Sequence, residues 1–182
     1  MTGFNPEKQI IYEDNHLIVV NKYPSQIVQG DKTGDAPLSD LIKKHLKKKY
    51  NKPGNVFLGV VHRLDRPVSG LVVFAKTSKA LSRLNELLRK NELSKTYWAV
   101  VKSLPPQESG VLRDYLLKDE KRNKSFVVKE GKKGAKQAEL KYSLVLSGKT
   151  YHLLEIELIT GRHHQIRAQL SHSGCPIKGD LK

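Results

Sequence analysis

The chain reads His62-Arg63-Leu64-Asp65-Arg66-Pro67 at the point where one short apolar run ends and a second is about to begin. The two runs, at 56–61 and 71–75, are rich in branched and aromatic residues, as buried strands are. Pro67 and Gly70 predict a turn between them. Asp65 is therefore expected at the end of a strand, on a loop that a rigid scaffold holds, where catalytic groups are often placed.

This segment alone leaves three interpretations of Asp65 open. It lies between Arg63 and Arg66, so its carboxylate could form a structural ion pair. It could also cap the turn through its own backbone. The third interpretation is a catalytic carboxylate, and the other motifs of the chain bear on the choice.

The composition points to a partner that carries negative charge. The 182 residues contain 33 Lys plus Arg against 18 Asp plus Glu, which gives a net charge of +15 and a pI near 9.8. Such a surface attracts polyanions, so nucleic acid is the expected partner and an anionic membrane is the alternative. The length suffices for one domain with a sizeable core, or for two small lobes that share one sheet.

The sequence predicts a cytoplasmic protein without membrane spans, disulfides or metal. No apolar run approaches the length of a membrane span, and Met1 to Gln9 lack the apolar core of a signal peptide. Cys175 is the only cysteine, which excludes a disulfide framework. The seven histidines are mostly scattered, and no spacing resembles a zinc site.

The hydrophobic pattern predicts an α+β fold with a mixed, mostly antiparallel sheet that helices flank. Period-two alternation at 138–146 and 152–158 indicates strands with one buried face. Further strands are expected at 10–12, 17–20, 56–61, 71–75, 97–101 and 126–128. Helices are expected after Pro37, after Ser78 as N-cap, and from about Arg162 to Ser173 with Gly174 as C-cap.

A second informative stretch is Gly161-Arg162-His163-His164-Gln165-Ile166-Arg167. Basic residues are unusual at a helix N-terminus, because the helix dipole is positive there. The arrangement is explained if an anion, either a phosphate or a carboxylate, docks at this end. The alternative is a basic surface cluster without a ligand.

Taken together, the motifs resemble those of the RluA-type family of pseudouridine synthases. The resemblance covers most of the chain, in family order and spacing. It rests on His62-Arg63-Leu64-Asp65 with Ser69-Gly70, on Ala75-Lys76-Thr77, on Lys95-Thr96-Tyr97, and on Thr160-Gly161-Arg162-x-His164-Gln165-Ile166-Arg167 with Gly174-Cys175-Pro176-Ile177 and Gly179-Asp180.

The resemblance implies that the chain converts uridine within RNA to pseudouridine, with no metal, redox partner or nucleotide cofactor. Asp65 is then the catalytic residue, which attacks the ribose, adds to the uracil ring, or removes a ribose proton; the sequence does not choose among these. Arg167 is its implied ion-pair partner. Tyr97 is implied to lie against the flipped uracil, although the residues alone favour a core aromatic at this position.

The same resemblance implies which residues bind RNA. Arg63 is expected to fill the space that the extruded base leaves. His62, Arg66 and Arg162 are expected to contact phosphates, together with surface lysines. The implied substrate is ribosomal or transfer RNA, bound by a monomer, with the target uridine in a loop or at a stem end.

Two departures from the family pattern affect what we expect of the fold. Asn21-Lys22-Tyr23-Pro24-Ser25 inserts Tyr23 before the proline and lacks the nearby glycine, in a loop that is not expected to carry the chemistry. The chain also stops at Leu181-Lys182, where the family continues with further strands, so it is either a fragment or has a short sheet. We expect residues 1–182 to form a single catalytic domain without an N-terminal RNA-binding domain of the S4 type.

Two other classes of protein remain as rivals. A non-catalytic RNA-binding protein that keeps the fold is expected to have lost Asp65, Tyr97 or Arg167, and all three are present. A nuclease requires paired carboxylates for metal or a histidine pair for acid–base chemistry. Asp65 has no carboxylate neighbour in the sequence, which argues against a nuclease.

Overall fold

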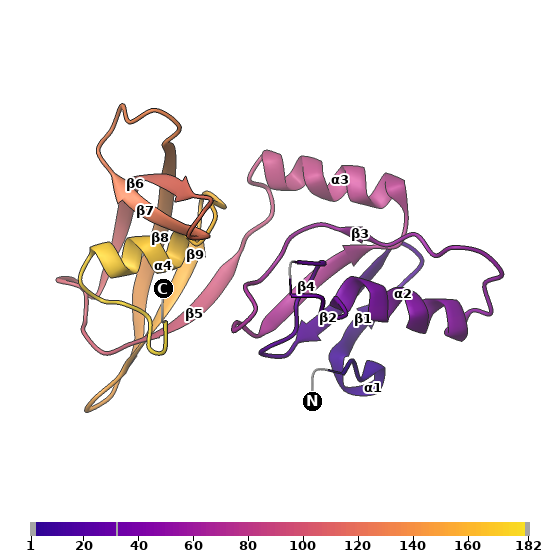
Figure 1. Ribbon diagram of the computed structural model, residues 1–182. Coiled ribbons are helices and arrows are strands. Elements are labelled where there is room, and N and C mark those ends of the chain that lie inside the picture. The colour runs from indigo at the N-terminus through magenta and orange to yellow at the C-terminus, as the bar shows by residue number, and fades with distance from the viewer. Residues whose placement is uncertain (1–2, 32, 181–182) are drawn as a thin grey trace. The chain divides into compact units, whose positions relative to one another are not determined.

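A computed structural model describes residues 3–31 and 33–180. The chain forms two compact units, Met1–Lys90 and Asn91–Lys182, and each has its own sheet (Figure 1). Each unit also has its own hydrophobic core. The expectation about the chain end at Leu181-Lys182 concerns residues outside the described part.

The first unit is built on a four-stranded sheet in the order β1-β2-β4-β3, with every pair antiparallel. Its strands are β1 (Ile10–Glu13), β2 (Leu17–Lys22), β3 (Gly59–Val60) and β4 (Gly70–Ala75). The side chains of β2 alternate between half-buried and buried, because successive residues of a strand point to opposite faces.

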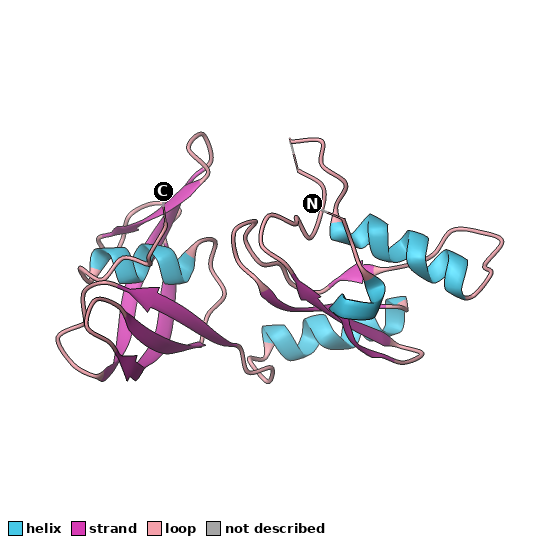
Figure 2. Cartoon of the chain, turned by 90° about the horizontal axis from the view of Figure 1, so that it is seen from below, coloured by secondary structure: helices cyan, strands magenta, loops and turns pink. Residues whose placement is uncertain are grey.

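Three helices accompany this sheet: α1 (Pro6–Gln9), α2 (Leu38–Lys49) and α3 (Ser78–Arg89). The helix α2 covers one face, where its Leu38, Ile42 and Leu46 pack against β2 and β4. The helix α3 lies on the other face (Figure 2). The sheet from which the Asp65 loop emerges is therefore packed between α2 and α3.

The second unit contains a five-stranded antiparallel sheet in the order β5-β9-β8-β6-β7. Its strands are β5 (Thr96–Val101), β6 (Ser109–Asp119), β7 (Lys124–Val128), β8 (Lys136–Ser147) and β9 (His152–Leu158). The helix α4 (Gln165–His172) packs on one face of this sheet, with Leu170 fully buried in a core that includes Leu140, Leu154 and Ile156.

The predicted α+β class with an antiparallel sheet is confirmed, and most elements lie where the sequence placed them. The described residues form two antiparallel sheets rather than one mixed sheet. The long strand β6 was not predicted. Only Gly59 and Val60 of the expected strand at 56–61 pair with a neighbour.

Three local predictions are wrong, each for a local reason. Leu146 was expected on the buried face of β8, but a bulge between Leu144 and Leu146 shifts the register and leaves Leu146 65% exposed. The N-cap of α3 is Thr77 rather than Ser78, because the Thr77 hydroxyl accepts from the Ala80 amide. The helix α4 begins at Gln165 rather than near Arg162, as described below.

Candidate active site

The predicted catalytic loop joins β3 to β4 and closes through a turn. The Val68 amide donates to the carbonyl oxygen of Asp65 at 3.0 Å, which fixes the backbone around this residue. Asp65 and Arg66 are half-buried, and Arg63 is exposed. The sheet therefore presents the carboxylate on an ordered loop, as the sequence predicts.

His62 is tied to the sheet next to this loop. Its Nε2 atom accepts a hydrogen bond from the Val73 amide of β4 at 3.2 Å, and the residue is half-buried. This contact gives the imidazole a structural role. The predicted contact between His62 and a phosphate stays a prediction.

A buried lysine, which the sequence analysis did not single out, holds the loop from beneath. Lys22 is the last residue of β2 and follows Ile18 and Val20 onto the buried face at period two, with none of its surface exposed. Its ammonium group donates to three carbonyl oxygens: that of Tyr23 at 3.2 Å, that of Arg66 at 3.1 Å, and that of Val68. Two of these acceptors belong to the Asp65 loop.

The environment of Lys22 also changes its acidity. Burial lowers the pKa of the Lys22 ammonium from 10.5 to about 8, because a low-dielectric interior disfavours the charged form. The negative charge of Asp65 opposes this shift, and the positive charge of Arg66 adds to it. Lys22 is thus electrostatically coupled to the carboxylate that the motif marks as catalytic.

The loop that departs from the family pattern contacts the same carbonyl group. The Ser25 amide donates to the carbonyl oxygen of Arg66 at 2.8 Å. Ser25 has a φ of 71°, a left-handed conformation in which glycine carries no steric cost. Although this loop was not expected to carry chemistry, it helps to fix the position of the Asp65 loop.

Arg66 is engaged by acidic residues, which the sequence analysis did not foresee. Its guanidinium donates to the Asp35 carboxylate at 2.6 Å, to the Asp31 carboxylate at 3.2 Å, and to the Thr33 hydroxyl at 2.6 Å. All three partners lie on the exposed segment before α2. Two carboxylates offset the positive charge of Arg66, which weakens its attraction for a phosphate.

The Ala75-Lys76-Thr77 motif has a structural explanation in the first unit. The Lys76 ammonium lies 2.7 Å from the carboxylate of Glu13, which also binds Lys49 at 2.7 Å and the Tyr50 hydroxyl at 2.8 Å. Burial alone would raise the pKa of Glu13, but these hydrogen bonds and the charge of Lys76 outweigh it and lower the pKa from 4.5 to about 2.

The second unit carries the other two predicted catalytic residues. Tyr97 lies on β5 opposite Ile156 of β9, is half-buried, and packs against the second core. Its packing agrees with the core aromatic that the residues alone favour. The expected contact of Tyr97 with uracil remains a prediction.

Arg167 lies on α4 and forms a two-point ion pair with Asp180. Its Nε atom donates to one carboxylate oxygen of Asp180 at 2.7 Å, and a terminal nitrogen contacts the other oxygen. The side chains of Arg167 and Asp180 are only 18% and 11% exposed. Such a planar, bidentate contact fixes the orientation of the guanidinium as well as its charge. Asp180 belongs to the Gly179-Asp180 motif, and its pairing with Arg167 was not predicted from the sequence.

The segment before α4 is anchored by a buried glutamine. His164 has a left-handed φ of 51°, so the helix begins only at Gln165. The Gln165 side-chain oxygen accepts from the Arg162 amide at 2.9 Å and from the Thr160 hydroxyl at 2.8 Å. The Arg162 side chain donates to the carbonyl oxygen of Gln137 at 2.8 Å. Arg162 therefore lies before the helix, next to β8, and its side chain is exposed.

Across residues 3–31 and 33–180, no group of three or more His, Cys, Asp or Glu side chains could hold a metal ion. No helix in the same described part is long and apolar enough to cross a membrane. The features that the two units do supply are an anchored aspartate loop in one and a fixed arginine in the other.

Comparison with known proteins identifies the same family that these motifs resemble. A family model described as "RNA pseudouridylate synthase" matches residues 16–172. "Ribosomal large subunit pseudouridine synthase C" of Buchnera aphidicola subsp. Acyrthosiphon pisum is 37% identical over 174 residues, which are 96% of this chain and 53% of that relative. The protein of the same name in Pasteurella multocida is 36% identical over 97% of this chain and 52% of its own length.

A solved structure shares the fold. The protein titled "Human RNA Pseudouridylate Synthase Domain Containing 4" superposes with a TM-score of 0.81 at 27% identity, over 96% of this chain and 68% of its own. The chain spans about half the length of the curated relatives that it matches.

Proposed function

The chain belongs to the RNA pseudouridylate synthase family, and we propose that it isomerises uridines within RNA to pseudouridine with Asp65 as the catalytic carboxylate. One observation carries this proposal: the family match runs from residue 16 to residue 172 and so includes Asp65, Tyr97 and Arg167 together with their motifs. The anchoring of the Asp65 loop by Lys22 supports it, because a catalytic group requires a fixed position.

The proposed reaction breaks one bond of the nucleotide and forms another. The bond from ribose C1′ to uracil N1 breaks, the base turns, and a bond from C1′ to C5 forms; C5 then loses its hydrogen as a proton to solvent, and N1 gains a proton. Asp65 can serve as nucleophile toward the ribose, as nucleophile toward the ring, or as the base that removes a ribose proton. Each route requires an ionised carboxylate in a fixed orientation, and none requires a metal or a nucleotide cofactor.

We assign supporting roles to Tyr97 and Arg167. The half-buried ring of Tyr97 offers a surface for uracil and a hydroxyl for proton transfer. Arg167 is assigned as the cation that keeps Asp65 ionised, and its ion pair with Asp180 keeps the guanidinium plane fixed for that task. Both residues are catalytic in this proposal.

RNA binding is assigned to the basic residues of the catalytic loop and of the segment before α4. Exposed Arg63 suits the role of filling the gap that an extruded base leaves. His62, Arg66 and Arg162 are assigned to phosphates, although Arg66 must first release Asp31 and Asp35 to bind one with its full charge. The net charge of +15 supports this assignment.

The substrate we favour is ribosomal RNA, because two relatives are named for the large ribosomal subunit. Transfer RNA is the second candidate from the resemblance. We further propose that the protein acts as a monomer in the cytoplasm, where a single unpaired cysteine is unremarkable.

The proposal is tested with RNA that carries tritium at C5 of uridine. Purified protein is expected to release tritium from a large-subunit ribosomal RNA transcript, and mapping of pseudouridine in the product identifies the position. Transfer RNA transcripts serve as the comparison substrate. RNA binding without tritium release from either RNA would instead indicate the rival function, a non-catalytic RNA-binding protein.

A further inference from the structure

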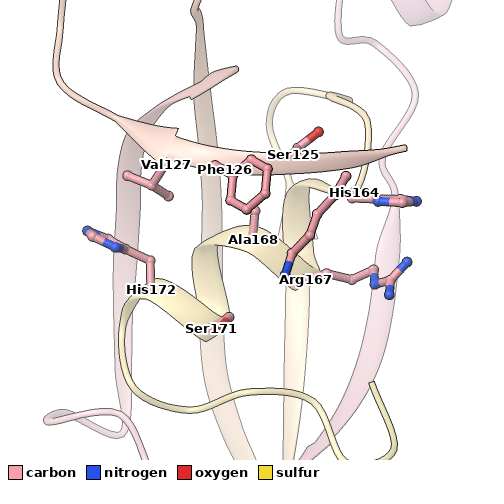
Figure 3. A pocket seen from close by; sticks show the side chains of 9 residues that line it. Ser125, Phe126, Val127, His164, Arg167, Ala168, Ser171 and His172 are labelled. Carbon is pink, nitrogen blue, oxygen red and sulfur yellow. The ribbon is translucent and has the colours of Figure 1, made fainter. Parts of the chain in front are cut away.

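The second unit contains a pocket that adjoins Arg167, which is assigned to the catalytic centre, and that is lined mostly by residues without a role in the proposed chemistry. It has a volume of about 350 Å³ and lies between β7 and α4 (Figure 3). The strand contributes Lys124, Phe126 and Val127 to its lining, and the helix contributes Ala168, Ser171 and His172. We call it the β7–α4 pocket. Its volume lies within the range of about 300–1,000 Å³ that is typical of small-molecule sites.

The periodicity of α4 separates this pocket from the hydrophobic core. Ile166 and Leu170 face the core of the second unit, with which Tyr97 also packs. Ala168, Ser171 and His172 lie on the opposite side of the helix, because residues three and four apart share a face. The pocket is therefore a separate feature from the surface on which Tyr97 lies.

The lining combines an aromatic ring with cations. Phe126 is half-buried, and the Lys124 ammonium lies 5.2 Å from the centroid of its ring. His172 and Ser171 on the helix add polar groups that can contact a phosphate. No carboxylate occurs among the described residues that line the pocket, and Asp180, the partner of Arg167, is not one of them. An aromatic face beside cations suits a nucleotide, whose base stacks while its phosphate binds the cation.

We propose that the β7–α4 pocket binds an unpaired nucleotide of RNA, with the base against Phe126 and the phosphate at Lys124 and His172. The inference rests on the proposed function and deepens it, because it adds a second nucleotide subsite to the target uridine. Arg167 also lines the pocket and is assigned to the catalytic centre, so α4 connects the two sites. The nucleotide in the pocket then belongs to the strand that carries the target.

The first test substitutes Phe126 and measures the Kd of a short, fluorescein-labelled, single-stranded oligoribonucleotide by anisotropy. Phe126→Leu keeps an apolar side chain but removes the stacking face, so we expect the Kd to rise by about fivefold or more. Phe126→Tyr keeps the ring and should bind as wild type does. Unchanged affinity in Phe126→Leu would overturn the proposal.

A matched control exists in the same unit. Lys178 lies 5.0 Å from the ring centroid of exposed Tyr151, which repeats the pair of a lysine and an aromatic ring outside the pocket. Tyr151→Leu is expected to leave the Kd unchanged. If Tyr151→Leu weakens binding as much as Phe126→Leu does, the contribution is a general one of surface aromatics and the pocket proposal fails.

A second variant keeps the test decisive if Phe126→Leu does not fold. Ala168→Leu introduces a good helix former that fills the pocket from the side of α4 and leaves Phe126 in place. It should raise the Kd, and wild-type affinity in a folded Ala168→Leu protein would overturn the proposal.

Tritium release separates this inference from the proposed function. If wild-type protein releases no tritium while Phe126→Leu still weakens binding, the proposed function fails and the nucleotide site stands. If wild-type protein releases tritium and Phe126→Leu binds as wild type does, the proposed function stands and the nucleotide site is overturned.

Discussion

The buried ammonium group of Lys22 donates a hydrogen bond to the carbonyl oxygen of Arg66, which is the residue next to the proposed catalytic Asp65. The same ammonium also binds the carbonyl oxygen of Val68. A fully buried lysine is rare, because desolvation of its charge costs free energy. Here the buried ammonium group stabilises the backbone of one short loop, which makes Lys22 a positioning residue.

Replacement of Lys22 should therefore affect catalysis more than binding. Lys22→Met keeps the volume and the apolar stem but cannot donate to the loop. We expect tritium release to fall by about tenfold or more, because a small displacement of a catalytic group is costly. The Kd for RNA should stay unchanged, since the side chain is buried.

The control is Lys79→Met, which removes an exposed lysine of α3. Circular dichroism should show that both variants fold. A folded Lys22→Met protein that turns over at the wild-type rate would show that the loop holds its position without the lysine.

The acidic pair at Arg66 should limit RNA affinity. Asp31→Asn combined with Asp35→Asn removes both carboxylates from the Arg66 guanidinium. If Arg66 binds a phosphate, RNA should bind more tightly and the salt dependence should steepen, because one more counterion is released.

Any loss of two negative charges also strengthens RNA binding in general, so the control must remove two as well. Asp40→Asn combined with Glu86→Gln does so at exposed ion pairs with Lys43 and Lys90 elsewhere in the same unit. Equal gains in affinity in the two double variants would show that Arg66 does not contact an RNA phosphate.

Glu13 should make stability depend on pH in the acid range. Its pKa is about 2 in the folded protein against 4.5 as the ordinary value, so its contribution is fully present above pH 4.5 and is lost as the pH falls toward 2. Glu13→Gln should lower the free energy of unfolding at pH 7 by an amount on the order of 2 kcal/mol. Denaturant titrations should show the two proteins converging as the pH falls from 4.5 to 2; a constant difference would contradict this account.

The ion pair between Arg167 and Asp180 should matter for turnover through its geometry. Arg167→Lys keeps the charge but loses the planar two-point contact. Its turnover should therefore be severely reduced relative to wild type, while its RNA binding is retained. Asp180→Asn should reduce turnover less, because the guanidinium remains but is less well oriented. Wild-type turnover in Arg167→Lys would show that charge alone suffices.

The sequence predicted those features that depend on local pattern. Alternating residues located β9, whose Leu154 and Ile156 are buried, and the pair Pro67 and Gly70 located the turn that carries Asp65. Lys22 could have been identified too, because it continues the period-two spacing of Ile18 and Val20. A lysine at an inward position of a strand indicates either an error in register or a buried interaction.

Other features depend on contacts that no local pattern reports. The bulge that exposes Leu146 interrupts a regular alternation without any glycine or proline to mark it. The left-handed conformation of His164 delays the start of α4 to Gln165, although the sequence predicted a helix from about Arg162. The ion pairs between Arg66 and Asp31 or Asp35 join residues more than thirty positions apart. Their pairing follows from the fold and not from the spacing.

The measurement that tests the central claim most directly is tritium release by Asp65→Asn. Asparagine is nearly isosteric and keeps an amide that can form the turn, so it removes only the ionised oxygen. Asp40→Asn, at an exposed ion pair with Lys43, is the matched control and should turn over as wild type does. If Asp65 is the catalyst, Asp65→Asn should fold and bind RNA normally and release no tritium from C5-labelled uridine. If Asp65 only forms an ion pair, its loss should cost about 1 kcal/mol of stability or less. Tritium release from Asp65→Asn at the wild-type rate would contradict the account.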